Sequence, residues 1–338
     1  MPDVEDQLIG SIDQGTGSSR FLVFSSKTRK VVAMHQIECK LMHPKEGLFI
    51  RWAEMYPDEM LSATAKCIET TCEALKKEGY TLAQIKGIGI TNQRETTIVW
   101  DKNTGKALYN AIVWMDARTT ELAHEMALKT PSKSVDHFRS TCGLPINPYF
   151  SALKLRWLLD NVPEVRKAVD DGTAIAGTVD TWLIWHLTGR TAHVTDVTNA
   201  SRYLLYNLKT KQWDKDVCAF FGVPMSILPE VRSSAEVYAN VKLGALTGTP
   251  ICGCLGDQQA ALVGHFCFSE GQAKNTYGTG TFMLYNTGTA PVISSAGLLT
   301  TVAFQLGANA DMFYALEGAG SIGGTSVRWL RDNLGVIK

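Results

Sequence analysis

A strand, a tight glycine turn and a second strand occur twice in this chain, and this repeat constrains the fold more than any other feature. Residues 12–24 read IDQGTGSSRFLVF, and residues 276–286 read TYGTGTFMLYN. Further apolar runs separated by turn residues follow each copy, which predicts two copies of one antiparallel meander. We expect three strands in the same order in both copies.

Helical and strand patterns alternate after the first meander. Residues 57–78 have helical periodicity, and KGIGIT at 86–91 is typical of a buried strand. A helix between two strands indicates a crossover, so we expect an α/β fold. Additional strands are expected at 96–100, 111–114 and 173–177, and additional helices near 119–129, 150–161, 180–187, 212–221 and 258–265.

Length and composition restrict the class of protein. A chain of 338 residues exceeds one usual hydrophobic core, so we expect two domains, 1–265 and 266–338. The 33 basic and 33 acidic side chains balance, which argues against a nucleic-acid partner. The acidic N-terminus lacks the features of a secretory signal, and no apolar run reaches membrane-spanning length. These features predict a cytoplasmic protein.

The eight cysteines are scattered through the chain without a CxxC pair, which predicts reduced thiols. Cys252 and Cys254 are separated by one residue in an expected strand, and without a further pair of ligands we do not expect them to share a metal. Trp182 and Trp185 lie on one face of an expected helix, where a core position is the simpler interpretation.

The first glycine hairpin has the composition of a phosphate site. Glycines allow close backbone approach, and hydroxyls at Thr16, Ser18 and Ser19 add polar groups around an anion. Asp13 precedes the turn, where a carboxylate can hold a divalent metal, and Arg20 adds a cation. The simpler alternative is a β-hairpin whose glycines only form the turn. Neither GTG segment fits the P-loop or the dinucleotide-binding pattern.

Two further polar clusters occur where an expected strand ends. Asn92, Gln93, Arg94 and Glu95 follow KGIGIT, at the edge where open α/β sheets place ligands. Arg94 and Glu95 are either an ordinary surface ion pair or a pair that binds the hydroxyls of a small polyol. Asp257 precedes an expected helix, where an N-cap is the structural interpretation.

Several longer motifs resemble one family. ITNQRETTIVWD at 90–101, NAIVWMDART at 110–119, YFSALKLRWLLDN at 149–161, GTVDTWLIWHLTG at 177–189, TDVTNASR at 195–202, GDQQAALVG at 256–264 and AKNTYGTGTFML at 273–284 together resemble the glycerol kinases of the FGGY carbohydrate kinase family. That family lies within the actin-like ATPase superfamily. The resemblance implies a ribonuclease-H-like fold, with one complete domain and the start of a second, and paired phosphate hairpins.

The resemblance also implies the substrates and the residues that bind them. Glycerol and ATP would be the substrates, with Mg²⁺ as the metal and Asp257 as the catalytic base. The glycerol site would combine polar and aromatic residues: Arg94, Glu95, Trp114, Tyr149, Asp257, Gln258 and Phe282. Nucleotide phosphates would contact Thr16, Gly17, Ser18, Arg20, Thr279, Gly280 and Gly324. Asp13 and Asp257 would hold Mg²⁺ through water.

Three alternatives stay open at this point. The first is another small polyol or sugar as the substrate of the kinase, because the hairpins and Asp257 serve the whole superfamily. The chain stops at WLRDNLGVIK, one helix into the expected second domain, so it is also interpreted as a truncated chain that binds glycerol without catalysis. A homo-oligomer is compatible with the sequence.

Overall fold

The computed structural model describes residues 6–44, 52–278, 280–320 and 323–337. Its largest sheet has six strands in the order β13-β14-β5-β1-β2-β3. β1, β5 and β14 are parallel, whereas β2 and β3 continue from β1 as an antiparallel meander. The strand bounds are β1 (Leu8–Gln14), β2 (Ser18–Ser25), β3 (Val31–Glu38), β5 (Ile85–Asn92), β13 (Ala239–Asn240) and β14 (Pro250–Gly256). This sheet confirms the opening meander and the expected α/β, ribonuclease-H-like fold.

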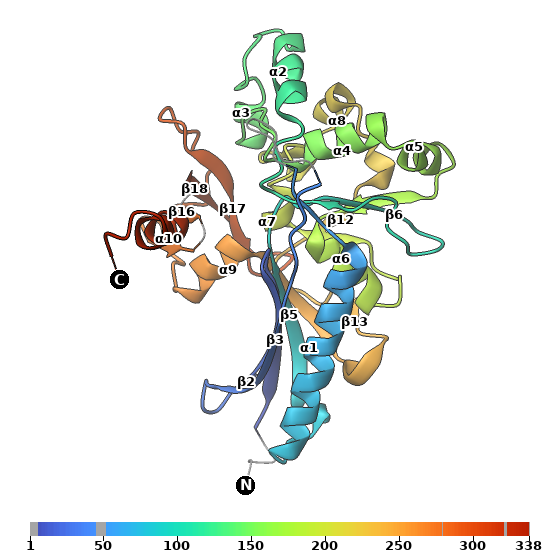
Figure 1. Cartoon of the computed structure of the whole chain (residues 1–338), viewed down its shortest axis with the longest axis vertical. Coiled ribbons are helices and arrows are strands. Elements are labelled where there is room, and N and C mark those ends of the chain that lie inside the picture. Colours follow the sequence, from blue (N-terminus) through green and yellow to red (C-terminus); the bar gives the residue numbers. More distant parts are fainter. Residues whose placement is uncertain (1–5, 45–51, 279, 321–322, 338) are drawn as a thin grey trace.

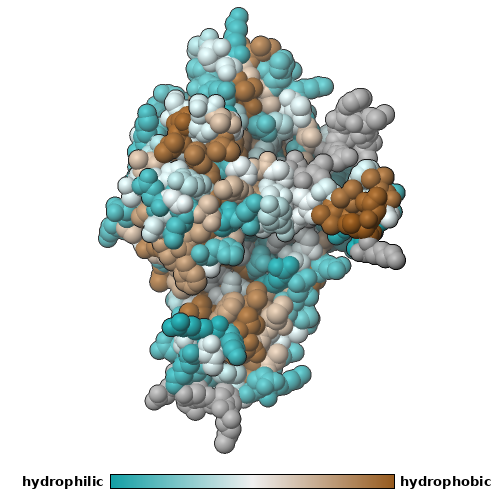
Figure 2. Space-filling model, turned by 90° about the vertical axis from the view of Figure 1, so that its left-hand side faces the viewer, coloured by the Kyte–Doolittle hydropathy of each residue, from teal (hydrophilic) through white to brown (hydrophobic). Residues whose placement is uncertain are grey.

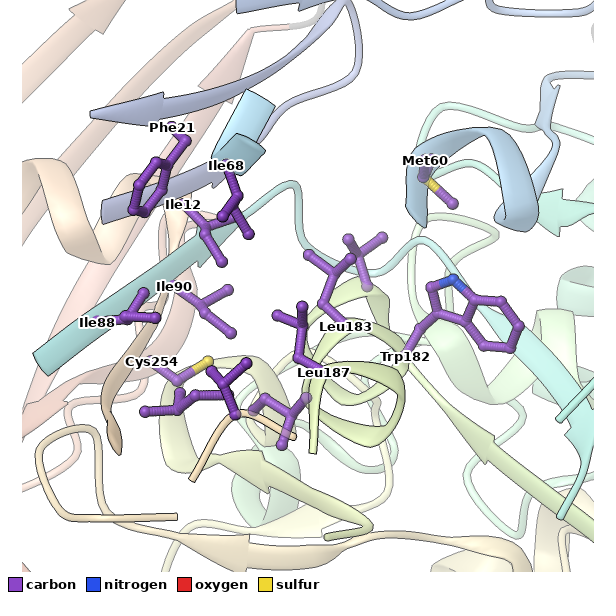
Figure 3. Close-up of a cluster of buried hydrophobic side chains, with 14 of the residues drawn as sticks. Ile12, Phe21, Met60, Ile68, Ile88, Ile90, Trp182, Leu183, Leu187 and Cys254 are labelled. Atoms are coloured by element: carbon purple, nitrogen blue, oxygen red, sulfur yellow. The ribbon is translucent and has the colours of Figure 1, made fainter. Parts of the chain in front are cut away.

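Helices α1 (Pro57–Lys77) and α6 (Val179–Leu187) share the main hydrophobic core with this sheet. The first turn of α1 contains Pro57, which needs no N–H partner there, and the last turn carries two lysines that favour the helix dipole. Figure 3 shows side chains of β1, β5 and α6 meeting in this core. Trp182 is fully buried and Trp185 packs against the same core, as expected.

A second, mostly helical part is built from segments between β5 and β13, together with the short strand β4, and its helices lie at the top of Figure 1. Its helices are α2 (Thr120–Lys129), α3 (Arg139–Cys142), α4 (Ser151–Asn161), α5 (Pro163–Asp170) and α8 (Lys215–Phe221). Short strand pairs accompany them: β4 (Glu54–Met55) with β7 (Ala111–Ile112), β6 (Ile98–Asp101) with β8 (Ala174–Gly177), β9 (Val194–Asp196) with β12 (Glu230–Arg232), and β10 (Tyr206–Asn207) with β11 (Gln212–Trp213). A separate apolar core holds the helices together.

Several expected bounds in this part are wrong. The helix expected at 212–221 begins at Lys215, because Asp214 caps it by accepting from the N–H groups of Asp216 and Val217. The strand expected at 111–114 ends at Ile112. α5 was not expected, because it contains eight residues and follows α4 after a single residue.

The C-terminal sheet corrects the predicted repeat. Its strands β15 (Ala273–Tyr277), β16 (Thr281–Gly288), β17 (Leu299–Gln305) and β18 (Met312–Gly320) have the order β15-β16-β18-β17. The hairpin β15–β16 corresponds to β1–β2, but β18, not β17, pairs with β16. β17 forms a hairpin with β18 and also meets the N-terminal part, where the Thr300 N–H donates to the Gly143 carbonyl at 3.0 Å.

Two observations concern the surface and the thiols. In the described ranges, no helix is long and apolar enough to cross a membrane. Helix α10 (Gly324–Asp332) exposes apolar side chains, among them Val327 and Trp329. Figure 2 looks onto the side of the molecule where α10 lies and shows several brown areas among the teal and white ones. All eight cysteines are free, and Cys254 is buried whereas Cys252 is half-buried.

Candidate active site

A cavity of about 410 Å³ lies where β1, β5 and β14 end, facing the β15–β16 hairpin. Many residues that the sequence singled out line it: Thr16, Gly17, Arg94, Glu95, Trp114, Tyr149, Asp257, Gln258, Gly280 and Phe282. Four predicted residues are not among its lining residues: Asp13, Ser18, Arg20 and Gly324. Thr279 lies outside the described residues.

Both glycine hairpins reach the cavity. Gly17 lines it from the first hairpin, and Gly278 and Gly280 line it from the second. The glycines of the first turn have no left-handed φ angle, so backbone conformation is not the reason for glycine there. A Cβ atom on Gly17 would meet no atom within 4 Å, so this glycine leaves open space beside the backbone. Such space allows a ligand to approach the main chain closely.

The hydroxyls of the first hairpin point in different directions. Thr16 lines the cavity, where its hydroxyl donates to Gln93 Oε1 at 3.2 Å and accepts from Trp114 Nε1 at 2.9 Å. Ser19 is fully buried and its hydroxyl donates to Gln14. The expectation that Ser19 presents a hydroxyl to an anion is therefore wrong, because successive residues of β2 face opposite sides and Ser19 is on the buried side.

Asp13 and Arg20 form an ion pair across β1 and β2. They are directly opposite in the antiparallel register, and Arg20 Nη1 lies 3.1 Å from Asp13 Oδ2. Burial raises the pKa of the Asp13 carboxyl, and the Arg20 charge acts against this rise. Gly324 contacts the second hairpin, because its N–H donates to the Gly278 carbonyl at 2.7 Å. A Cβ on Gly324 would lie 2.7 Å from that same carbonyl oxygen, so a larger residue would displace the hairpin.

Arg94 and Glu95 are not a surface ion pair. Both side chains are buried, and Arg94 Nε lies 4.0 Å from Glu95 Oε1. The main partner of Arg94 is Glu317 of β18, which accepts from Nη1 at 2.5 Å and from Nη2 at 2.9 Å. Burial alone would raise the pKa of Glu317, but Arg202 and Arg94 lower it to about 2. Arg94 is thus a fixed cation at the cavity wall.

Glu95 has its own cationic partner and an unusual backbone. Arg202 Nε donates to Glu95 Oε1 at 2.5 Å, and both side chains are buried. Burial raises the pKa of Glu95, and Arg202 and Arg94 act in the opposite direction. The φ angle of Glu95 is 60°, in the left-handed region that non-glycine residues seldom adopt. A strained backbone of this kind persists only where the surrounding structure holds it, and such residues are concentrated at functional sites.

Three aromatic rings form one wall of the cavity. The Trp114 ring centroid lies 5.8 Å from that of Tyr149 and 6.0 Å from that of Phe282, both with edge-on geometry. Lys154, a buried residue of α4, donates to the carbonyls of Pro148 and Tyr149 and so holds the turn that carries the Tyr149 ring. The wall combines apolar ring faces with the Tyr149 hydroxyl, which lies 3.4 Å from Arg94 Nη2.

Asp257 is the first residue of α9 (Asp257–Gly264), and Gly256 is the N-cap. The expectation that Asp257 caps this helix is therefore wrong by one position. Its Oδ1 accepts from the Gln258 N–H at 2.8 Å and lies 3.4 Å from Arg94 Nε. The side chain is 37% exposed, towards the cavity that it lines. Burial by the surrounding protein raises the pKa of this carboxyl, and the Arg94 charge opposes the rise.

Lys274 supports Gln258 and Phe282 of the cavity lining and was not predicted. Its Nζ donates to Gln258 Oε1 at 2.5 Å, to Thr276 Oγ1 at 2.9 Å and to the Phe282 carbonyl at 3.3 Å. Burial lowers the pKa of Lys274 to about 8. Glu317, Arg202 and Lys274 lie within quoted motifs or expected strands, but their partners are distant in sequence, and no local pattern identified their contacts.

Comparisons with known proteins show the family of the chain. The N-terminal domain of the FGGY family of carbohydrate kinases matches residues 8–264, and the C-terminal domain of that family matches residues 273–338. A probable glycerol kinase from Caenorhabditis elegans is 59% identical over 330 residues, 98% of this chain and 64% of the relative. A glycerol kinase from Brucella anthropi is 52% identical over 335 residues, 98% of this chain and 65% of the relative.

A solved structure is similar over the same extent. The crystal structure of Plasmodium falciparum glycerol kinase with ADP superposes with a TM-score of 0.89 and 41% sequence identity. The match covers 97% of this chain and 64% of the other. The chain therefore spans slightly less than two thirds of the length of these similar proteins.

Proposed function

The chain belongs to the FGGY family of carbohydrate kinases, and on that premise we propose that it binds glycerol and transfers the γ-phosphoryl group of ATP to a primary hydroxyl. The products are glycerol 3-phosphate and ADP. The observation that carries this proposal is the cavity in which a buried arginine, a buried glutamate, three aromatic rings and Asp257 converge. The names of the similar proteins support the choice of glycerol.

The chemistry of the cavity wall suits a small polyol. Arg94 offers N–H donors, Glu95 offers acceptor oxygens, and the Tyr149 hydroxyl does both. A polyol hydroxyl both donates and accepts, so a paired donor and acceptor bind it without an unpaired group. Trp114 and Phe282 cover the carbon chain with apolar surface. Glycerol, with three carbons and three hydroxyls, matches this division into polar and apolar surfaces.

Asp257 is the base in the proposed reaction. Its carboxylate faces the cavity, and burial raises its pKa, which makes it a stronger base than a free aspartate. Arg94 Nε at 3.4 Å keeps the side chain oriented towards the polyol wall, which consists of Arg94, Glu95, Trp114, Tyr149 and Phe282. Asp257 accepts the proton of the attacking hydroxyl as the oxygen forms its bond to phosphorus. The loose transition state of phosphoryl transfer demands little proton removal beforehand, so a weak base suffices.

The phosphate groups of ATP lie between the two hairpins in this proposal. Gly17 and Gly280 line the same cavity as Asp257, so phosphate held there is close to the proposed base. The main chain beside Gly17 is accessible, which favours N–H contacts to phosphate oxygens. Ser18, Arg20 and Gly324 extend the phosphate site beyond the cavity lining.

Asp13 and Asp257 have positions suited to a hydrated Mg²⁺. The register pairs Asp13 of β1 with Thr91, and Gly256, the residue before Asp257, with Asn92. Strands β1 and β14 are two strand spacings apart, roughly 10 Å. Mg²⁺ retains several waters and uses one or two carboxylates together with substrate phosphates, which fits this donor set. When bound, the ion neutralises charge on the phosphates.

A coupled assay of glycerol-dependent ADP release by the 338-residue chain tests the proposal, with Asp257→Asn as the control. We expect release by the wild type and its loss in the variant. Release that does not depend on glycerol, or that the substitution leaves unchanged, would overturn the proposed reaction.

Calorimetric titration with glycerol separates binding from turnover. The chain spans about 64% of the length of its relatives, so the two properties are tested separately. Glycerol binding without ADP release would make the chain a polyol-binding protein, and absence of both would refute the proposal.

A further inference from the structure

Four buried charges form a connected cluster behind the polyol wall. Glu317 accepts from both terminal nitrogens of Arg94, at 2.5 and 2.9 Å, and from Arg202 Nη2 at 3.1 Å. Arg202 in turn donates to Glu95 at 2.5 Å. Arg94 and Glu95 line the cavity, whereas Glu317 and Arg202 are completely buried and do not appear in its lining. Arg94 and Glu95, the two charged residues of this wall, therefore each have an oppositely charged partner behind it: Glu317 for Arg94 and Arg202 for Glu95.

The cluster joins distant parts of the chain. Arg94 and Glu95 follow β5, Arg202 follows the short helix α7 (Val197–Ala200), and Glu317 lies in β18. Arg94 and Glu317 are 223 residues apart. Glu317 is fixed in the middle of the C-terminal sheet, where it pairs with Leu284 of β16 and Leu299 of β17. The C-terminal sheet is thus attached to the polyol wall by a buried ion pair.

Arg202 holds two other features of the wall. Its guanidinium binds Glu95, whose φ of 60° requires continuous support from the surroundings. The same guanidinium lies 5.4 Å from the centroid of the Tyr149 ring, within the range of a cation–π contact. Ser151 adds a hydrogen bond to the Glu95 carbonyl at 3.2 Å. Without Arg202, the Glu95 carboxylate would lose its nearest cationic partner, and the Tyr149 ring would lose this cation–π contact.

We propose that Glu317 and Arg202 are positioning residues of the polyol site. Glu317 holds the Arg94 guanidinium in place at the cavity wall, and Arg202 orients Glu95 and Tyr149. This inference rests on the proposed function, because it assigns the two residues a task in glycerol binding. It also predicts that the placement of the C-terminal sheet controls the shape of the polyol wall through Glu317.

Glu317→Asp tests the proposal while keeping the negative charge. A side chain shorter by one methylene cannot hold Arg94 and Arg202 together at their present distances. We expect the glycerol dissociation constant to rise roughly 10- to 100-fold. At metal sites, mutation of a residue that orients a ligating side chain lowers affinity by a similar factor. The measurement is calorimetric titration with glycerol, accompanied by a melting curve of each variant.

Glu54→Asp is the matched control. Glu54 is buried and bound to Arg118 at 2.7 Å, but it is not among the residues that line the cavity. The control is expected to lower the melting temperature by a similar amount and to leave glycerol affinity within twofold of wild type. A general loss of stability would instead weaken glycerol binding equally in both variants, which would overturn the positioning role.

Arg202→Lys tests the same cluster from its other side. Lysine keeps the charge but lacks the planar fork that reaches Glu95 and Glu317 together. We expect the same loss of glycerol affinity as for Glu317→Asp, and this variant serves if Glu317→Asp does not fold. Wild-type affinity in either folded variant would refute the inference alone. A wild-type chain that does not bind glycerol would refute the proposed function and the inference with it.

Discussion

Replacing Arg94 with methionine should destabilise the protein strongly, because it removes one charge from a balanced buried cluster. Arg94, Arg202, Glu95 and Glu317 are at most 3% exposed and carry two positive and two negative charges. Arg94→Met leaves a net negative charge in the interior. Removing one partner of a buried ion pair costs about 3–5 kcal/mol, because the other charge stays buried without compensation.

The expected change in melting temperature follows from the size of the chain. An unfolding entropy of about 2.1 cal/mol/K per residue gives about 0.7 kcal/mol/K for 338 residues. The substitution should therefore lower the melting temperature by about 4–7 °C, as measured by circular dichroism. Adding Glu317→Gln restores electrical balance, so the double variant should recover part of this loss.

Arg156→Met provides the matched control for this prediction. Arg156 pairs with Asp160 at 2.6 Å, and both side chains are 33% exposed. An exposed pair contributes about 0–1 kcal/mol, so the control should lower the melting temperature by less than about 2 °C. Equal losses for Arg94→Met and Arg156→Met, or a double variant less stable than Arg94→Met, would refute the argument from buried charge balance.

Further substitutions test individual groups of the site. Asp257→Asn should lower kcat about 10²- to 10⁴-fold with little change in KM for glycerol, and an unchanged kcat would exclude this base. Gly17→Ala should leave the melting temperature unchanged, because a Cβ there meets no atom within 4 Å, yet raise KM for ATP about tenfold; an unchanged KM would exclude phosphate contact at this turn. Lys274→Met should weaken glycerol binding roughly fivefold in calorimetry, because Gln258 loses its 2.5 Å partner. Glu317, whose pKa falls from 4.5 to about 2, stabilises the fold above pH 4.5 and loses this contribution as the pH falls towards 2. Melting curves from pH 3 to 7 should therefore have a smaller slope with pH in Glu317→Gln, and equal slopes would contradict this assignment.

The sequence predicted those elements that depend on neighbouring residues. The glycine turns, the alternation of the flanking strands and the periodicity of residues 57–78 are local, and β1–β3, α1 and the β15–β16 hairpin formed as expected. The order of β17 and β18 was wrong, because strand pairing depends on contacts outside the strands. Thr300 of β17 binds Gly143 of the N-terminal part, so this strand lies at the edge of its sheet.

Prediction of the candidate site also depended on whether a feature was local or formed between distant parts of the chain. The strand end after KGIGIT and the start of α9 indicated Arg94, Glu95 and Asp257 as site residues, and all three line the cavity. The family resemblance, which rests on motifs spread over the chain, added the aromatic residues of the wall. The tertiary structure alone decided how these residues are held. Glu317 meets Arg94 across 223 residues, and Arg202 meets Glu95 across 107. Only folding removes these charges from water, and this burial turns an apparent surface pair into a cluster whose members depend on one another.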